Sequence, residues 1–213
     1  MNIRSLLSRE DYEEYLLRLV FGATLGKDGV DYISACVTRS YLDMCRTLAG
    51  IAAVPERDLL KRQAEELVRT RLEDLRQSWT PTPDQESFDA WHHEVCEAMI
   101  DTFERHGYDQ LYVGQAQKWI NTAFRYLYTL GEQRAPGFGR VYPFCHLPLD
   151  APLVERLSAD YGLPPLSSPW SRLTDYDEYL AYQQQVRRRF VLAPLDVEFL
   201  LSMDRPQDRQ RIV

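Results

Sequence analysis

Apolar side chains recur every three or four residues along most of the chain, a spacing that predicts α-helices. In residues 8–25 the expected buried face consists of Tyr12, Tyr15, Leu16, Leu19 and Val20. The same spacing predicts further helices over residues 30–49, 56–79, 85–106, 113–130, 150–159, 174–190 and 196–203. Strand-like alternation is nowhere sustained. We therefore expect an all-α protein.

One long interruption separates two of these helices. Residues 131–149 are rich in glycine and proline, which predicts a loop. Asp150 follows this loop directly and is a favoured residue for capping the amino end of the next helix. A proline-rich linker over residues 164–169 then leads to the last two helices. The loop and the aspartate that ends it distinguish this part of the chain from the rest.

The chain has 213 residues, of which 45% are hydrophobic, enough for one substantial core. We expect a single helical domain over residues 1–213, with acidic helices in 1–108. No apolar run is long enough for a membrane span, and charged residues interrupt the apolar stretches of residues 1–25, so we expect no secretion signal there. The four cysteines are scattered, which favours reduced thiols. These features predict a cytoplasmic protein without a membrane partner.

The net charge of −7 is unfavourable for nucleic-acid binding, but the charge is unevenly distributed. Residues 1–108 carry 13 basic and 20 acidic side chains, whereas residues 109–213 carry 12 of each. Arginines gather in the second half, and the candidates for contact with a DNA backbone include Arg140, Arg187, Arg188 and Arg189. A locally basic face is therefore expected there.

Lysine is rare in this arginine-rich chain. There are 22 arginines but only three lysines, Lys27, Lys61 and Lys118. A lysine amine can lose its proton and act as a nucleophile, which an arginine guanidinium cannot do. Lys118 falls in an early turn of the helix over residues 113–130, where the positive end of the helix dipole disfavours an ammonium. Its side chain is expected on a polar, exposed face, together with Gln115, Asn121, Thr122 and Arg125.

Lys118 and Asp150 also occur in a wider pattern. The lysine ends the stretch Gly114-Gln115-Ala116-Gln117-Lys118, and the aspartate ends Pro148-Leu149-Asp150, 32 residues later. This pattern resembles the helix-hairpin-helix superfamily of DNA glycosylases, whose members carry glycine-apolar-glycine-x-lysine and Pro-Val-Asp. The separation is most similar to that of the archaeal 8-oxoguanine glycosylase branch. Ala116 stands where the family has its second glycine, and no cysteine cluster for an iron–sulfur centre follows Asp150.

The resemblance implies a helix-hairpin-helix-like fold, with residues 109–213 as the catalytic half. It also implies base excision from double-stranded DNA by a monomer without a cofactor. Lys118 would attack the sugar C1′ atom or position a water, and Asp150 would support the developing positive charge. The target would be an oxidised purine or a modified base, such as one of phage DNA, in a repair or a defence role. Candidates for the base pocket are Tyr142, Phe144, His146, Trp170, Asp196 and Phe199. Further candidates for contact with the DNA backbone are Gly114, Gln115 and Gln117.

Three other interpretations have some support in the sequence. A non-catalytic, helical protein-interaction module fits the acidic first half and the aromatic content of 12%. Arg140 and His146 match the arginine–histidine spacing of HEPN-type ribonucleases, although Pro143 interrupts the motif. His92, His93 and Cys96 could suggest a metal site, but no fourth ligand is evident, so no metal is expected.

Overall fold

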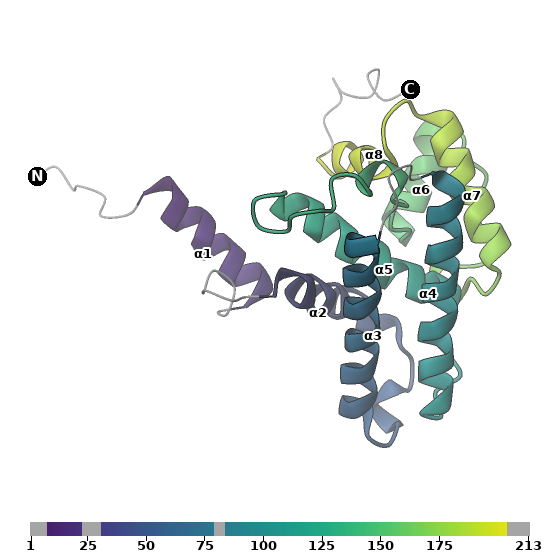
Figure 1. Ribbon diagram of the computed structural model, residues 1–213. Coiled ribbons are helices and arrows are strands. Elements are labelled where there is room, and N and C mark those ends of the chain that lie inside the picture. The colour runs from purple at the N-terminus through teal and green to yellow at the C-terminus, as the bar shows by residue number, and fades with distance from the viewer. Residues whose placement is uncertain (1–7, 23–30, 79–83, 204–213) are drawn as a thin grey trace, which may run out of the picture.

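The computed structural model describes residues 8–22, 31–78 and 84–203, which form helices joined by loops (Figure 1). Within these ranges there is no strand, and no helix combines the length and apolar character needed to cross a membrane. The all-α prediction is confirmed. The α-helices are α1 (Arg9–Phe21), α2 (Tyr32–Met44), α3 (Arg57–Ser78), α4 (Gln85–Arg105), α5 (Val113–Leu130), α6 (Ala151–Tyr161), α7 (Tyr176–Arg189) and α8 (Pro194–Ser202), and the short 3-10 helices are η1 (Cys45–Thr47), η2 (Ile51–Ala53), η3 (Tyr142–Phe144) and η4 (Trp170–Arg172).

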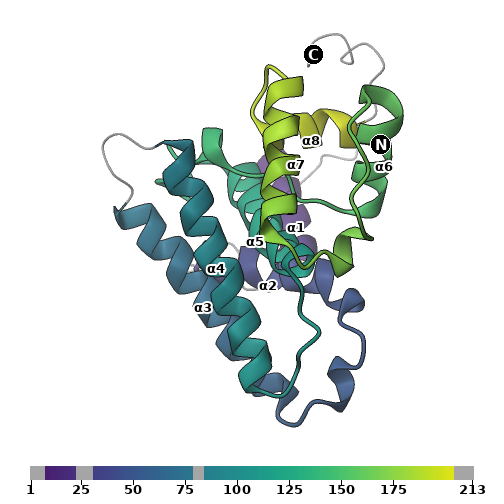
Figure 2. The same ribbon diagram turned by 90° about the vertical axis from the view of Figure 1, so that its right-hand side faces the viewer.

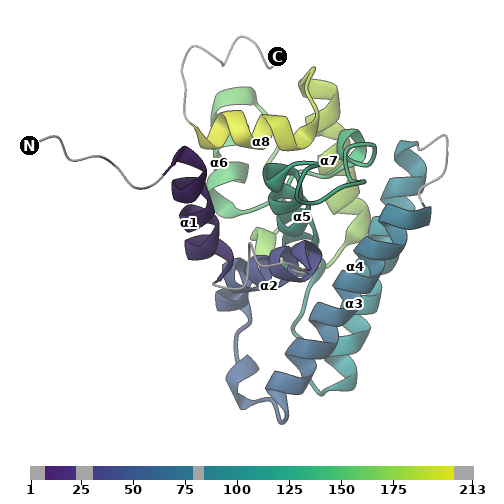
Figure 3. The same ribbon diagram turned by 60° about the vertical axis from the view of Figure 1, so that its left-hand side comes forward.

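Helix α5 is the centre of the fold. It packs most extensively against α2, and α3 and α4 lie side by side next to this pair (Figures 2 and 3). The indole of Trp119 is fully buried between α5 and α2 and donates a 2.9 Å hydrogen bond to the carbonyl of Val37. Because α2 belongs to the first half of the sequence and α5 to the second, the two halves share one core.

Aspartates begin many of these helices. Asp31, Asp84, Asp150 and Asp175 each precede a helix and accept hydrogen bonds from backbone amides in its first turn. These amides have no partner inside the helix, so an aspartate at this position stabilises the helix end by about 1 kcal/mol. The prediction that Asp150 caps a helix is confirmed, because its Oδ1 accepts from the amide of Leu153 at 3.0 Å.

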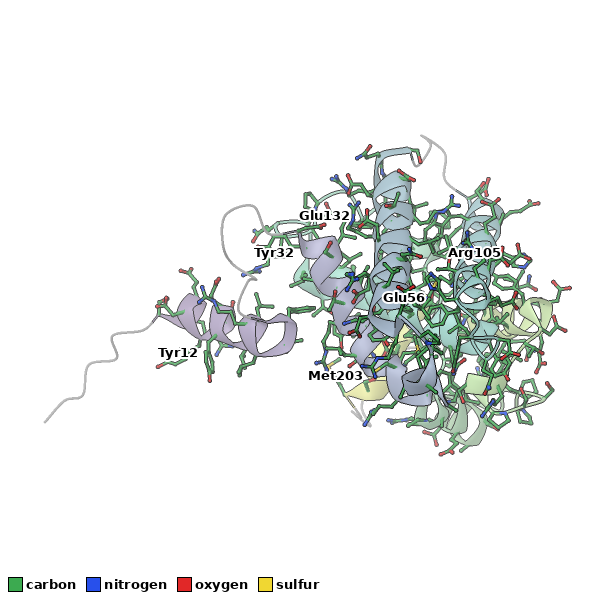
Figure 4. The ribbon with its side chains drawn as sticks, turned by 90° about the horizontal axis from the view of Figure 1, so that it is seen from below. Tyr12, Tyr32, Glu56, Arg105, Glu132 and Met203 are labelled. Atoms are coloured by element: carbon green, nitrogen blue, oxygen red, sulfur yellow. The ribbon has the colours of Figure 1, made fainter. Side chains whose placement is uncertain are left out.

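The predicted burial of α1 is wrong. No residue of α1 is buried, and the helix extends away from the other helices (Figures 1 and 4). The expected inner face is exposed, from 40% at Val20 to 62% at Leu19. Contact with the rest of the chain is made at the end of α1, where the ring of Phe21 packs edge-on against Tyr126. Apolar spacing shows which side of a helix is hydrophobic, but not whether another element covers it.

The predicted exposure of α5 is also wrong. Gln115, Asn121, Thr122 and Lys118 were expected on a polar surface, but each is at most 6% exposed. Helix α5 is covered on nearly all sides by its neighbours. Polar groups buried in this way are costly unless they find partners inside the protein. The partners of these side chains define the candidate site.

Candidate active site

Lys118 and Asp150 meet at the junction of α5 and α6. The Nζ atom of Lys118 lies 2.7 Å from Oδ2 of Asp150 and 3.4 Å from the carbonyl oxygen of Pro148. The side chain of Lys118 is 8% exposed, whereas that of Asp150 is 34% exposed. The amine is therefore covered by protein, and the carboxylate is the member of the pair that faces solvent.

The first turn of α5 is held against η4 by a glycine. The amide of Gly114 donates a 3.0 Å hydrogen bond to the carbonyl of Leu173. A Cβ atom at Gly114 would lie 1.6 Å from the carbonyl oxygen of Trp170, so no other residue fits without movement of the backbone. This close approach fixes the start of the helix that carries Lys118 four residues later.

Two glutamines hold the segment that leads to Asp150. The side-chain amide of Gln117 accepts from the Leu149 N–H at 3.2 Å and donates to the Leu149 carbonyl at 3.1 Å. Gln183 of α7 forms the same two bonds with Leu147. Its side-chain oxygen accepts from the Leu147 N–H at 3.0 Å, and its side-chain nitrogen donates to the Leu147 carbonyl at 2.8 Å. The two buried amides thus pair with alternate residues of an extended segment, as a neighbouring strand would. Gln117 directly precedes Lys118 and Leu149 directly precedes Asp150, so this pair of bonds connects the two segments that carry the lysine and the aspartate.

A buried polar network extends from Gln117 into the core. Asn121 donates to Oε1 of Gln117 at 3.0 Å and to the hydroxyl of Tyr179 at 2.8 Å. The Tyr179 hydroxyl lies 2.8 Å from Nδ1 of His146, whose Nε2 lies 2.7 Å from Oδ1 of Asp89. Burial lowers the pKa of His146 well below its usual value, which favours a neutral ring that donates to Asp89 and accepts from Tyr179.

Asp150 also borders an open hollow of about 300 Å³ between α5, α6 and α8. Inside it, Nη1 of Arg125 donates to Oε1 of Glu198 at 2.7 Å. Arg125 lies two helical turns after Lys118 and therefore on the same side of α5. The residues that line the hollow are Arg125, Asp150, Pro152, Leu153, Arg156, Glu198, Leu201 and Ser202.

The six residues predicted for a base pocket do not gather around Lys118. His146 is fully buried in the core network. The Tyr142 hydroxyl donates to Oδ1 of Asp196 at 2.8 Å, and its ring stacks on Tyr128, ten residues beyond Lys118 or about 15 Å along α5. Phe199 stacks on the same tyrosine ring, which places it in this group as well.

The remaining two pocket candidates occupy other places. Trp170 lines a separate hollow of about 460 Å³, next to α6 and the proline-rich linker. The ring of Phe144 packs against the core, and its backbone carbonyl accepts from Gln85 and Arg187. Their spacing in the sequence gave no information on which loop residues reach the lysine, because that depends on how α6, α7 and α8 fold back onto α5.

The candidates for contact with a DNA backbone divide into two sets. Gly114, Gln115 and Gln117 are buried, and the amide groups of Gln115 and Gln117 already bind protein carbonyls. Their assignment to a DNA contact is wrong for this structure. Arg140, Arg188 and Arg189 are exposed, but Arg187 is partly buried and donates to the carbonyl of Phe144 at 3.2 Å.

The structure brings no support for a ribonuclease or a metal site. Arg140 donates to the carbonyl of Arg76, whereas the ring of His146 is enclosed in the core. His92 is buried as well, and its Nδ1 lies 2.8 Å from the hydroxyl of Tyr176. Among the residues that the structure describes, no three side chains of the metal-binding kinds gather into one group.

Several residues of the site were missed in the sequence. Glu198 was not associated with Lys118, whereas Arg125, seven residues after the lysine, was expected on the same face of the helix. Gln117 was expected to contact a DNA backbone and not the segment before Asp150, and Gln183 carried no signal at all. Comparisons with protein-family models, curated proteins and solved structures found no match to this chain.

Proposed function

We propose that this protein is a DNA glycosylase that excises a damaged or modified base, with Lys118 and Asp150 as its catalytic residues. The observation that carries the proposal is the 2.7 Å contact between the Lys118 amine and the Asp150 carboxylate, at the edge of an open hollow. A buried lysine held beside a carboxylate is an arrangement suited to nucleophilic catalysis. The motif resemblance described above, with the same two residues, also supports it.

The proposed reaction starts with a nucleotide that leaves the DNA stack and enters the hollow. The amine of Lys118, after giving a proton to Asp150, attacks the sugar C1′ atom. The new nitrogen–carbon bond replaces the glycosidic bond, whose electron pair leaves with the base. The proton held by Asp150 then goes to the departing base, so protons and charge balance. The bond between C1′ and the ring oxygen then breaks as a proton moves from the lysine nitrogen to that oxygen, which leaves a protonated imine between Lys118 and C1′.

The relative exposure of the pair determines how substrate reaches the amine. Asp150 lines the hollow, whereas Lys118 lies behind it. A nucleotide in the hollow therefore meets the carboxylate first, and the ion pair has to open before the amine can attack. The capping bond from Leu153 holds the other carboxylate oxygen in place during this change. In a water-attack mechanism the same two groups would orient a water molecule.

Base release from defined duplexes tests the proposal. The substrates are duplexes with one oxidised purine or one modified cytosine, and the released base is measured by chromatography and mass spectrometry. We expect release by the wild-type protein and a loss of at least about 10²-fold in Lys118→Ala and Asp150→Asn. Arg71→Ala, an exposed change on α3, is the control and should keep full activity. Equal activity of the Lys118→Ala variant would refute the proposal.

A second function, protein interaction without catalysis, is favoured by the exposed apolar side of α1. Tyr15, Leu16 and Leu19 are each more than half exposed there. If a second copy of the chain covers this side, Leu16→Ser and Leu19→Ser together should lower the mass measured by sedimentation equilibrium. The resemblance implies a monomer, and sedimentation of the wild-type protein as a monomer would exclude self-association.

A further inference from the structure

We infer that Glu198 reads the target base by accepting a hydrogen bond from an exocyclic amino group, so that the hollow beside Asp150 selects bases that carry such a group. The inference rests on the proposed function and adds a substrate class to it. Neither the motif nor the loop residues considered for base recognition includes Glu198.

One carboxylate oxygen of Glu198 has no hydrogen-bond partner. Oε1 of Glu198 accepts from Arg125, but Oε2 is buried and forms no hydrogen bond. Glu198 as a whole is only 5% exposed. A buried acceptor without a partner carries a free-energy cost, which is larger when the group is charged. A ligand that donates a hydrogen bond to this oxygen would remove the cost.

The position of Glu198 identifies where that ligand would sit. Glu198 and Asp150 line the same hollow, from α8 and from the start of α6. Thr122 lies one turn from Lys118 toward Arg125 and has a buried hydroxyl that also lacks a partner. A volume of about 300 Å³ is at the lower end of the range for small-molecule sites, which is suitable for a single base.

The chemistry of the oxygen determines the class of base. An ionised carboxylate accepts hydrogen bonds and cannot donate them, and aspartate or glutamate is the side chain that pairs with the amino group of cytosine. Guanine carries an amino group as well, whereas uracil and hypoxanthine have an oxygen or a hydrogen at the same positions. If an oxygen replaced the amino group, two hydrogen-bond acceptors, this oxygen and Oε2 of Glu198, would face each other, which is unfavourable. The hollow should therefore prefer cytosine-type, guanine-type or adenine-type bases over their uracil-type and hypoxanthine-type counterparts.

The test compares matched substrates that differ at this group. One pair of duplexes carries 5-hydroxymethylcytosine or 5-hydroxymethyluracil, and the other carries 8-oxoguanine or 8-oxohypoxanthine. For whichever pair is a substrate, we expect the wild-type protein to release the amino-bearing base about tenfold faster or more. Glu198→Gln keeps an oxygen for Arg125 and puts an amide N–H in place of Oε2. This variant should lose the preference or, in the pyrimidine pair, reverse it.

Two controls make the result specific. Glu155→Gln changes an exposed glutamate that lines the other hollow of α6, so it should keep the wild-type preference. DNA with an abasic site contains no base to read, and borohydride trapping on it should be equal in the wild type and in Glu198→Gln. Melting temperatures of both variants show whether each is folded.

The outcomes separate the inference from the proposed function. An unchanged preference in a folded Glu198→Gln variant, or a wild-type preference for the bases that lack the amino group, would overturn the inference and leave the glycosylase proposal in place. If no base is released and abasic DNA gives no adduct, the proposed function fails, and the inference fails with it.

Discussion

The Nζ atom of Lys118 and Oδ2 of Asp150 lie 2.7 Å apart, although 32 residues separate the two in the chain. The glycine contact at the start of α5 fixes one partner, and the Gln117 amide fixes the segment before the other. The pair is therefore held by its surroundings and not by the ion pair alone.

The two members of the pair should differ in their effect on stability. Asp150→Asn keeps a helix cap but leaves the buried Lys118 ammonium without a carboxylate, so the free energy of unfolding should fall by about 1–3 kcal/mol. Lys118→Met leaves a carboxylate that water reaches, so its cost should be smaller. Urea unfolding of both variants measures the difference. A larger loss in Lys118→Met would contradict the assignment of the amine as the covered partner.

Gln117 should act as a positioning residue for the proposed reaction. Gln117→Leu removes both hydrogen bonds to Leu149, next to Asp150, whereas Gln183→Leu removes the equivalent bonds to Leu147. Gln117→Leu should cost more stability, because it also removes the bonds to the Gly114 carbonyl and from Asn121. In folded protein it should lower kcat more than Gln183→Leu, by about 10–100-fold, because small displacements of reacting groups have large effects. KM for DNA should change little. Equal kcat values in the two variants would assign Gln117 to folding alone.

The buried histidines should make the fold sensitive to acid. Burial lowers the pKa of His92 and His146 well below 6.5, so both rings stay neutral in the folded chain. In the unfolded chain, histidines bind protons as the pH falls through about 6.5. The unfolded state then binds more protons than the folded state, so the free energy of unfolding decreases below that pH.

Melting temperatures between pH 8 and pH 5 measure this effect. The variant His93→Gln removes a histidine that is 42% exposed at its side chain and should keep the wild-type pH dependence. A replacement of His92 by a neutral residue of similar size, such as Gln, should reduce the dependence in a folded protein. A melting temperature that stays constant over this range would contradict the prediction, because it would mean that the two rings take up protons as readily in the folded chain as in the unfolded chain.

DNA binding should depend on the exposed part of the arginine run. Arg188 and Arg189 face solvent, so their replacement by glutamate should weaken duplex binding and reduce the slope of log affinity against log salt. Fluorescence anisotropy over a salt series measures both quantities. Arg71→Glu, on α3, is the matched control and should leave the slope unchanged. These two arginines would be excluded from the interface if the affinity for DNA did not depend on salt, or if replacing both arginines by glutamate left the affinity unchanged.

Apolar spacing and capping residues were sufficient to predict the helices. The expected helix over residues 113–130 has the same bounds as α5, and the expected loop over residues 131–149 contains only the short η3. Both follow from local chemistry, because glycine, proline and aspartate act within one or two turns. The meeting of Lys118 with Asp150 followed from a motif and not from spacing alone.

Long-range partners were beyond the reach of the sequence. Glutamine is usually found at the surface, but Gln117 is buried and pairs with the backbone of Leu149, which lies 32 residues away in the chain. Glu198 reaches Arg125 because α8 folds back, 73 residues away in sequence. The apolar side of α1 shows the reverse error, because no described element covers most of it. Local patterns predict an element, but its neighbours decide what is buried.

Borohydride trapping tests the central claim most directly. An imine between Lys118 and the sugar is reduced to a stable protein–DNA adduct, which migrates as one band on a denaturing gel and whose attachment site mass spectrometry identifies. We predict an adduct at Lys118 in the wild-type protein and none in Lys118→Arg, which keeps the charge but not the nucleophile. Base release without an adduct would replace covalent attack by water attack. Adduct formation by a folded Lys118→Arg variant, or neither release nor adduct from any modified duplex, would contradict the assignment of Lys118 as the nucleophile.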